Sequence, residues 1–101
     1  MKLGLLICLL PIILASCTTI TLPIQEYALA RSALVAAESA EAERLAPLLF
    51  QQAQQSFKRA EYLYQEREFE DAKLLFNKAK KLAERAETIS RVKKSKSGEV
   101  L

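Results

Sequence analysis

The spacing of apolar residues along the chain predicts helices. In residues 47–66 and again in residues 70–92, apolar side chains recur at steps of three and four, which places them on one face of a helix. The first stripe contains Leu49, Phe50, Ala53, Phe57, Ala60, Leu63 and Tyr64; the second contains Ala72, Leu75, Phe76, Ala79, Leu82, Ala83, Ala86 and Ile89. Alanine, leucine, glutamate, lysine and glutamine dominate, so no segment is typical of a strand. We therefore expect an all-α protein.

Residues 24–44 form a third predicted helix, which is rich in alanine. Its larger apolar residues are sparse but share one broad face, and so many small side chains favour close packing against neighbouring helices. Pro47 ends this helix, because the residue before a proline is pushed out of the helical region. The same proline suits the first turn of the following helix.

The boundary between the second and third stripes is less sharply marked. The connecting sequence QEREFED, residues 65–71, contains neither glycine nor proline, so one continuous helix from Pro47 is an alternative. A helical hairpin is favoured, because it gives each apolar stripe a partner. The expected architecture is a three-helix antiparallel bundle over residues 24–90.

The N-terminal segment has the layout of a secretory signal peptide. Lys2 supplies a positive charge, residues 3–14 are an apolar run, and small residues follow. As a helix this run reaches only about 18 Å, short of the roughly 30 Å hydrocarbon core of a bilayer. The alternative is an uncleaved single membrane span, because the uncharged stretch continues to Ile24. Pro11 and the polar residues 16–19 make its second half a poor membrane helix.

Leu14, Ala15, Ser16 and Cys17 resemble a bacterial lipobox. The resemblance implies that residues 1–16 are a lipoprotein signal peptide and that Cys17 carries a diacylglycerol and an N-acyl lipid, with residues 17–23 as a lipidated tether. Two or three acyl chains attach a protein firmly to a bilayer, since each buried CH₂ contributes about 0.8 kcal/mol to the free energy of membrane binding. Thr18 occupies the sorting position, where an aspartate would retain a lipoprotein at the inner membrane. In a Gram-negative host this implies the outer membrane, facing the periplasm.

Residues 56–87 resemble a single tetratricopeptide-type hairpin. Ala60 matches the small position of its first helix, residues 67–72 match the turn, and Phe76 and Ala79 match the large and small positions of its second helix. Arg67 stands where the pattern has glycine. No second copy is present, and a peptide groove of that family needs stacked repeats.

Together with the lipobox, these features resemble small bacterial lipoproteins that carry an uncharacterised tetratricopeptide-like domain, a domain of unknown function. The resemblance covers residue 24 to about residue 89. Relatives of that kind sometimes carry an OmpA-like peptidoglycan-binding domain, which implies a role in the cell envelope.

The composition argues against an enzyme. The chain has no histidine, its two cysteines are Cys8 and Cys17, and its two glycines are Gly4 and Gly98. Cysteine and histidine metal sites, histidine-assisted nucleophiles and phosphate-binding glycine loops therefore lack their residues. We expect no cofactor other than the covalent lipid on Cys17.

The net charge of +3 is concentrated in residues 91–101, which we expect to be a basic flexible tail containing Arg91, Lys93, Lys94 and Lys96. One interpretation is a solvated end with cations beside a helix C-terminus. The other is contact with anionic lipid or peptidoglycan. Nucleic acid is not an expected partner, because the cations lack interleaved aromatics.

Tyr62 and Tyr64 are two residues apart and cannot both face one core. We expect one of them to be exposed, either alone or with Phe69 as an aromatic contact patch. The function that fits these features is a membrane-anchored adaptor or structural subunit with an envelope protein partner. The alternative is a spacer that contacts peptidoglycan through the basic tail. Self-association would help to cover the small core.

Overall fold

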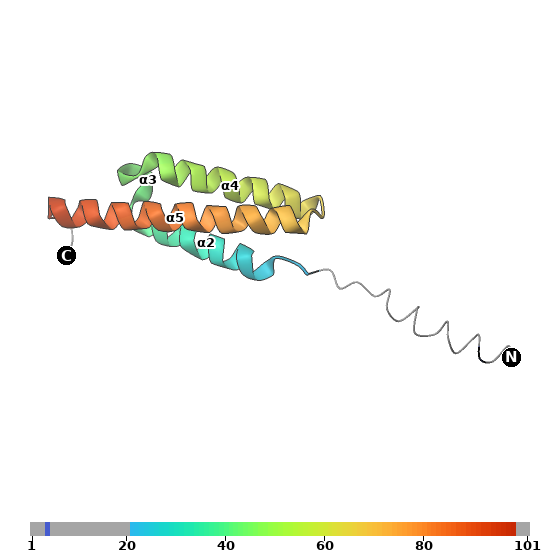
Figure 1. Ribbon diagram of the computed structural model, residues 1–101. Helices are drawn as coiled ribbons and strands as arrows, with labels where there is room; N and C mark the ends of the chain where they lie inside the picture. The colour runs from blue at the N-terminus through green and yellow to red at the C-terminus, as the bar shows by residue number, and fades with distance from the viewer. Residues whose placement is uncertain (1–3, 5–20, 99–101) are drawn as a thin grey trace.

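The computed structural model describes Gly4 and residues 21–98. Residues 21–98 contain the helices α2 (Ile24–Ser39), α3 (Ala42–Leu45), α4 (Pro47–Gln65) and α5 (Phe69–Ser97), and no strand (Figure 1). The all-α expectation is confirmed. The lipobox residues 14–17, the sorting residue Thr18 and the predicted signal peptide lie outside the described residues, apart from Gly4.

The three long helices lie lengthwise against one another. α5 packs along both α2 and α4, whereas α2 and α4 contact each other much less (Figure 1). α4 runs opposite to α2 and α5. α4 and α5 are separate helices that are joined at residues 66–68, as the hairpin interpretation requires. In the part of the chain that the structure describes, no helix is both long enough and apolar enough to cross a bilayer.

The core of this body is built almost entirely from alanine. Among residues 24–98, every buried apolar residue except Phe50 and Phe76 is an alanine. The buried side chains form one cluster toward α3 and another toward the α4–α5 turn, and half-buried leucines and aromatic residues close their sides. Small side chains let helix axes approach closely. The alanine-rich sequence therefore specifies close packing around α5.

The expected helix over residues 24–44 is wrong in one respect, because the structure divides it into α2 and α3. Glu41 has a φ of 61°, in the left-handed region, and its N–H donates a 2.9 Å hydrogen bond to the carbonyl of Glu38. The single turn of α3 then redirects the chain toward Pro47. Neither glycine nor proline occurs in residues 24–44 to indicate this break.

The expected flexible tail also needs correction, because α5 continues through Ser97. Residues 91–97 are helical, and Gly98 ends the helix in the left-handed conformation with a φ of 76°. Glycine is the residue that most readily adopts this conformation at the residue after a helix. Residues 99–101 lie outside the described residues.

The turn between α4 and α5 also contains a residue in the left-handed conformation, but this residue is Arg67 and not a glycine. Arg67 has a φ of 62°, and its N–H donates to the carbonyl of Tyr64 at 3.1 Å. The N–H of Glu68 donates to the carbonyl of Leu63 at 2.9 Å. These two bonds form a Schellman motif, whose left-handed position is usually glycine. Arg67 therefore occupies a strained position, which is also the position where the tetratricopeptide pattern has glycine.

Candidate functional site

Three aromatic rings, one from each long helix, meet near the turn between α4 and α5. Tyr27 of α2, Phe57 of α4 and Phe76 of α5 have ring centroids 5.4 Å apart in every pair. Tyr27 and Phe57 both meet Phe76 edge-on, at interplanar angles of 87° and 62°. Edge-on contacts between rings are favourable beyond their buried area. This cluster therefore fixes the level at which the three helices meet.

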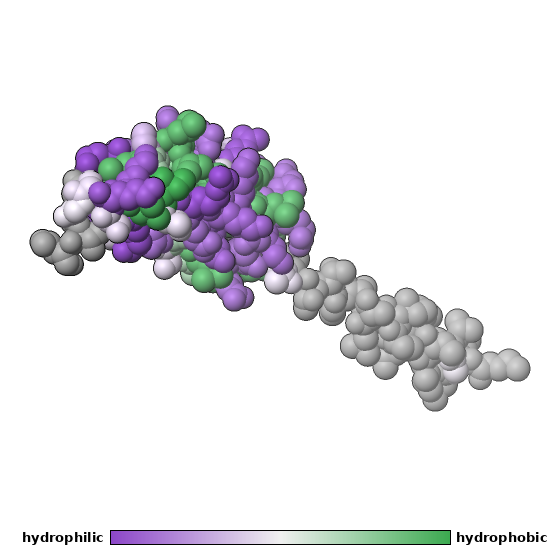
Figure 2. All heavy atoms as spheres, turned by 60° about the vertical axis from the view of Figure 1, so that its left-hand side comes forward, coloured by the Kyte–Doolittle hydropathy of each residue, from purple (hydrophilic) through white to green (hydrophobic). Residues whose placement is uncertain are grey.

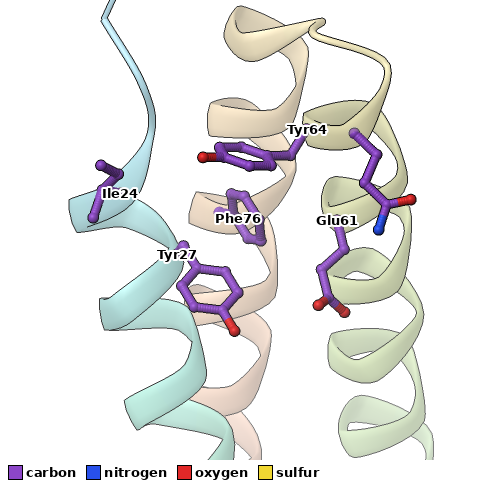
Figure 3. A pocket seen from close by; sticks show the side chains of 6 residues that line it. Ile24, Tyr27, Glu61, Tyr64 and Phe76 are labelled. Carbon is purple, nitrogen blue, oxygen red and sulfur yellow. The ribbon is translucent and has the colours of Figure 1, made fainter.

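Beside the cluster lies a groove of about 350 Å³ between α2 and α4. Its lining residues are Ile24, Tyr27, Glu61, Tyr64, Gln65 and Phe76. Figure 3 shows the rings of Tyr27 and Tyr64 on either side of Phe76, which lies between α2 and α4. A volume of this size is within the range of ligand pockets in proteins. The groove exists because α2 and α4 are held apart by α5 and touch each other little.

The groove is apolar except at one rim. Among its described lining residues Glu61 is the only charged one, and its half-buried side chain forms no ion pair with any residue from 21 to 98. On the α2 side, Ile24 is 60% exposed and extends the apolar surface toward the N-terminal segment. The groove therefore presents aromatic and aliphatic surface next to one unpaired carboxylate.

The helical body matches a known sequence family. The family described as "Domain of unknown function (DUF4398)" matches residues 25–99, which is most of the chain. The chain belongs to the DUF4398 family. No curated protein and no solved structure matches it. The DUF4398 match begins in the first turn of α2 and includes α3, α4 and α5, so the family corresponds to the whole helical body.

The predicted aromatic patch of this DUF4398 domain is only partly assembled. The rings of Tyr64 and Phe69 meet at 5.4 Å with an interplanar angle of 66°. Tyr62 is 52% exposed, and the guanidinium carbon of Arg59 lies 5.6 Å from its ring centroid. Since Tyr62 and Tyr64 project from different faces of α4, the structure brings Tyr64 and Phe69 together but not Tyr62.

The predicted basic residues are largely engaged within the DUF4398 domain. Lys93 donates to the carbonyl of Leu45, and Nζ of Lys94 lies 2.9 Å from Oε2 of Glu41. Arg91 pairs with Glu87 at 3.0 Å. Of the four basic residues expected to make contacts, Lys96 alone has a side chain that forms neither an ion pair nor a hydrogen bond with a described residue. These cations therefore hold the end of α5 rather than forming a free cluster.

The contacts of Lys94 also change the acidity of its partner. The hydrogen bond from Lys94, followed by that from Arg44, holds the pKa of the Glu41 carboxyl below its ordinary value of 4.5.

Within residues 21–98, no three or more acidic, histidine or cysteine side chains are grouped to hold a metal ion.

The sequence did not identify Ile24, Tyr27, Glu61 and Gln65 as members of a groove. Tyr27, Phe57 and Phe76 could be assigned to the buried faces of their helices. Whether these three rings meet at the same height along the bundle depends on where α2 ends and on the direction in which α3 turns the chain. No residue in that segment indicates the end of α2 or the direction of α3. The available signal was an aromatic residue on the core face of each predicted helix.

Proposed function

We propose that this chain is a non-enzymatic lipoprotein of the bacterial envelope that acts as an adaptor for another envelope protein. In this proposal residues 1–16 are removed as a signal peptide, and Cys17 carries the diacylglycerol and N-acyl lipid. Residues 17–23 tether a three-helix antiparallel bundle of α2, α4 and α5, with a tetratricopeptide-like hairpin. In a Gram-negative host, Thr18 assigns it to the outer membrane, facing the periplasm.

The groove between α2 and α4 is the observation that supports an adaptor role. Aromatic side chains are enriched at protein interfaces, because they bury a large area at a small cost in conformational entropy. The groove offers three such rings, and its apolar surface continues over Ile24. Such a continuous apolar surface suits an extended or helical segment of a protein better than a compact small molecule.

The carboxylate of Glu61 indicates what that segment would carry. An unpaired, half-buried anion at the rim of an apolar groove is complementary to a lysine or arginine beside an apolar anchor residue. We therefore propose an envelope protein whose contact segment places a basic residue next to aliphatic or aromatic side chains.

The anchor is tested by the substitution Cys17→Ser. The unsubstituted chain is expected to incorporate labelled palmitate in its bacterial host and to float with membranes, because the acyl chains provide its attachment. Cys17→Ser is expected to lose both properties. Unlabelled protein, or unchanged membrane association of Cys17→Ser, would refute the lipid anchor and favour an uncleaved membrane span.

The groove is tested by site-specific photocrosslinking in intact cells. A photoreactive amino acid at Gln65, which lines the groove, is compared with the same probe at Gln52, an exposed residue on a different face of α4. A defined envelope protein is expected to attach to the Gln65 probe and to be absent from the Gln52 probe. Equal attachment to both probes, or to neither, would contradict an adaptor groove.

A further inference from the structure

The face of α5 that points away from the core carries a continuous stripe of exposed residues. They follow one another at steps of three or four, which places them on one side of the helix. The outer stripe of α5, as we call it, consists of Leu74, Lys78, Lys81, Arg85, Thr88, Val92 and Lys96, all of them exposed. The opposite side of the same helix carries the buried Ala72, Phe76, Ala79, Ala83, Ala86 and Ser90.

The cations of α5 divide according to their position relative to this stripe. Those beside it have partners: Lys73 pairs with Glu26 at 3.7 Å, Lys80 with Glu84 at 3.6 Å, and Arg91 with Glu87 at 3.0 Å. Those within it form no ion pair with a residue from 21 to 98; they are Lys78, Lys81, Arg85 and Lys96. The stripe itself contains no acidic residue. It is therefore a line of cations without ion-pair partners in residues 21–98, and the nearby Glu84, which lines the same surface hollow as Lys81 and Arg85, pairs with Lys80 instead.

The dimensions and the apolar members of the stripe indicate a flat partner. The distance from Lys78 to Lys96 along the helix is about 27 Å. Leu74 is 66% exposed and Val92 is 47% exposed, so apolar side chains accompany the cations at both ends. Figure 2 shows that green apolar patches lie among purple hydrophilic residues on one face of the helical body. A line of cations is complementary to a flat anionic lipid surface, which attracts basic residues that lie close to it.

We propose that the outer stripe of α5 lies on the anionic phospholipid headgroups of the bilayer in which the chain is anchored. This inference rests on the lipid anchor of the proposed function. Each basic residue close to such a surface adds to the attraction, and the effect falls off within a Debye length. The aliphatic Leu74 and Val92 enter the headgroup region beside the cations.

The tether length is compatible with this orientation. The axis of α5 would lie about 5 Å above the headgroups. Because α2 packs beside α5, its axis is at most about 10 Å farther from the membrane. Ile24 is therefore at most about 15 Å from the headgroups. The chain from residue 17 to residue 24 spans up to about 23 Å when extended. Cys17 can reach the bilayer while α5 lies flat on it.

The same orientation leaves the groove accessible. Phe76 belongs to the buried side of α5 and lies between α2 and α4 in the groove (Figure 3). Leu74 and Lys78 are exposed on the other side of the helix. With the outer stripe on the membrane, the groove opens away from it. The two surfaces then serve different partners at the same time.

The experiment uses the full-length processed lipoprotein in vesicles of phosphatidylcholine, with or without phosphatidylglycerol. The described residues contain no cysteine, so Thr88→Cys places one fluorescent label on the outer stripe and Gln65→Cys places the matched control label in the groove. Quenching by headgroup-labelled lipid is expected to be several-fold stronger for the Thr88 label, only in the anionic vesicles, and to be lost at high salt. Equal quenching of both labels would overturn the proposal.

Charge-reversal variants test whether the position of the cations on the outer stripe, rather than the net charge of the chain, determines membrane contact. The triple variant Lys78→Glu, Lys81→Glu, Arg85→Glu is expected to abolish the composition-dependent quenching. The triple variant Lys58→Glu, Arg59→Glu, Arg67→Glu changes the net charge equally on other surfaces and is expected to retain it. Both variants are compared with the unsubstituted chain by circular dichroism. Equal losses in the two folded variants, or retention in the first, would contradict the stripe.

Two further measurements distinguish this proposal from a failed lipid anchor and from binding to an acidic protein. Flotation with pure phosphatidylcholine vesicles reports the acyl anchor alone, so a failed anchor and a failed stripe give different results. If soluble poly-glutamate, but not the anionic vesicles, protects the Thr88 label from a soluble quencher, the stripe binds an acidic protein and the lipid assignment is overturned.

Discussion

Nζ of Lys94 lies 2.9 Å from Oε2 of Glu41, and this contact joins the last turns of α5 to the corner between α2 and α3. Arg44 pairs with the same carboxylate oxygen at 3.2 Å, and Lys93 reaches the carbonyl of Leu45 beside it. Glu41 also has the left-handed backbone that separates α2 from α3. The exposed Glu41 therefore forms the corner between α2 and α3 and also binds the C-terminal end of α5, the longest described helix.

This relationship predicts a pH-dependent contribution to stability. The pKa of the Glu41 carboxyl is lowered in the folded chain, chiefly by the hydrogen bond from Lys94. A lowered folded pKa means that the stabilisation is present above the unfolded pKa of 4.5 and is lost as the pH falls through the lower folded value. Glu41→Gln is expected to reduce the free energy of unfolding at pH about 7 and to have a smaller effect at pH about 3.

Chemical denaturation of the unsubstituted chain and of Glu41→Gln at both pH values checks this prediction. Glu43→Gln, at an exposed residue of the same corner, is the matched control and is expected to show no such dependence. A difference between Glu41→Gln and the unsubstituted chain that stays constant across the acidic range would show that the carboxylate charge does not matter.

The turn at Arg67 predicts a stabilising substitution. A left-handed backbone costs an L-residue about 1–2 kcal/mol, and glycine avoids that cost but loses about 0.5–1 kcal/mol more backbone entropy on folding. Arg67→Gly is therefore expected to raise the free energy of unfolding by about 0.5–1 kcal/mol. Glu66→Gly, where φ is −78°, is expected to lower it. Urea denaturation distinguishes them, and a loss of stability in both variants would contradict the strain at Arg67.

The sequence predicted the elements whose apolar period is regular and whose boundaries carry strong local signals. The stripes in residues 47–66 and 70–92 predicted α4 and α5, and Pro47 predicted where α4 begins. The break after α2 could not be predicted, because Ala40 and Glu41 are both compatible with a helix. Its conformation accompanies contacts with Lys94 and Lys93, which are distant in the sequence.

The length of α5 was underestimated for a different reason. Its apolar stripe ends near Ile89, and the polar Ser90 interrupts the pattern. Ser90 is nevertheless fully buried, because its hydroxyl donates a 2.7 Å hydrogen bond to the carbonyl of Ala86 and thereby satisfies itself within the helix. Gly98 was the available signal for the true end, since glycine is strongly favoured just after a helix.

The alanine core predicts a strong dependence on side-chain size. Ala79 is fully buried between helices, whereas Ala28 is exposed on α2. Ala79→Leu inserts three further carbons where no space exists and is expected to lower the free energy of unfolding by about 1–3 kcal/mol. Ala28→Leu is expected to change it by less than about 0.5 kcal/mol. Thermal unfolding compares the two, and similar values would show that the helices do not depend on alanine for their approach.

The unpaired carboxylate of Glu61 predicts how partner binding responds to charge. Because Glu61 forms no ion pair with a residue from 21 to 98, its substitution should change the free energy of unfolding by less than about 0.5 kcal/mol. Glu61→Lys is expected to reduce the yield of the protein that crosslinks to a Gln65 probe several-fold, since a like charge then faces the partner's basic residue. Glu61→Gln should lie between Glu61→Lys and the unsubstituted chain.

The matched control for this charge series is Glu70→Lys, at an exposed residue in the first turn of α5 that does not line the groove. It makes the same change in net charge and is expected to leave the crosslinking yield unchanged. If Glu61→Lys and Glu70→Lys reduce the yield equally, overall charge determines binding rather than the groove. If neither reduces it, the partner segment carries no basic residue at this rim, and the apolar surface over Tyr27, Tyr64 and Phe76 would have to supply the recognition alone.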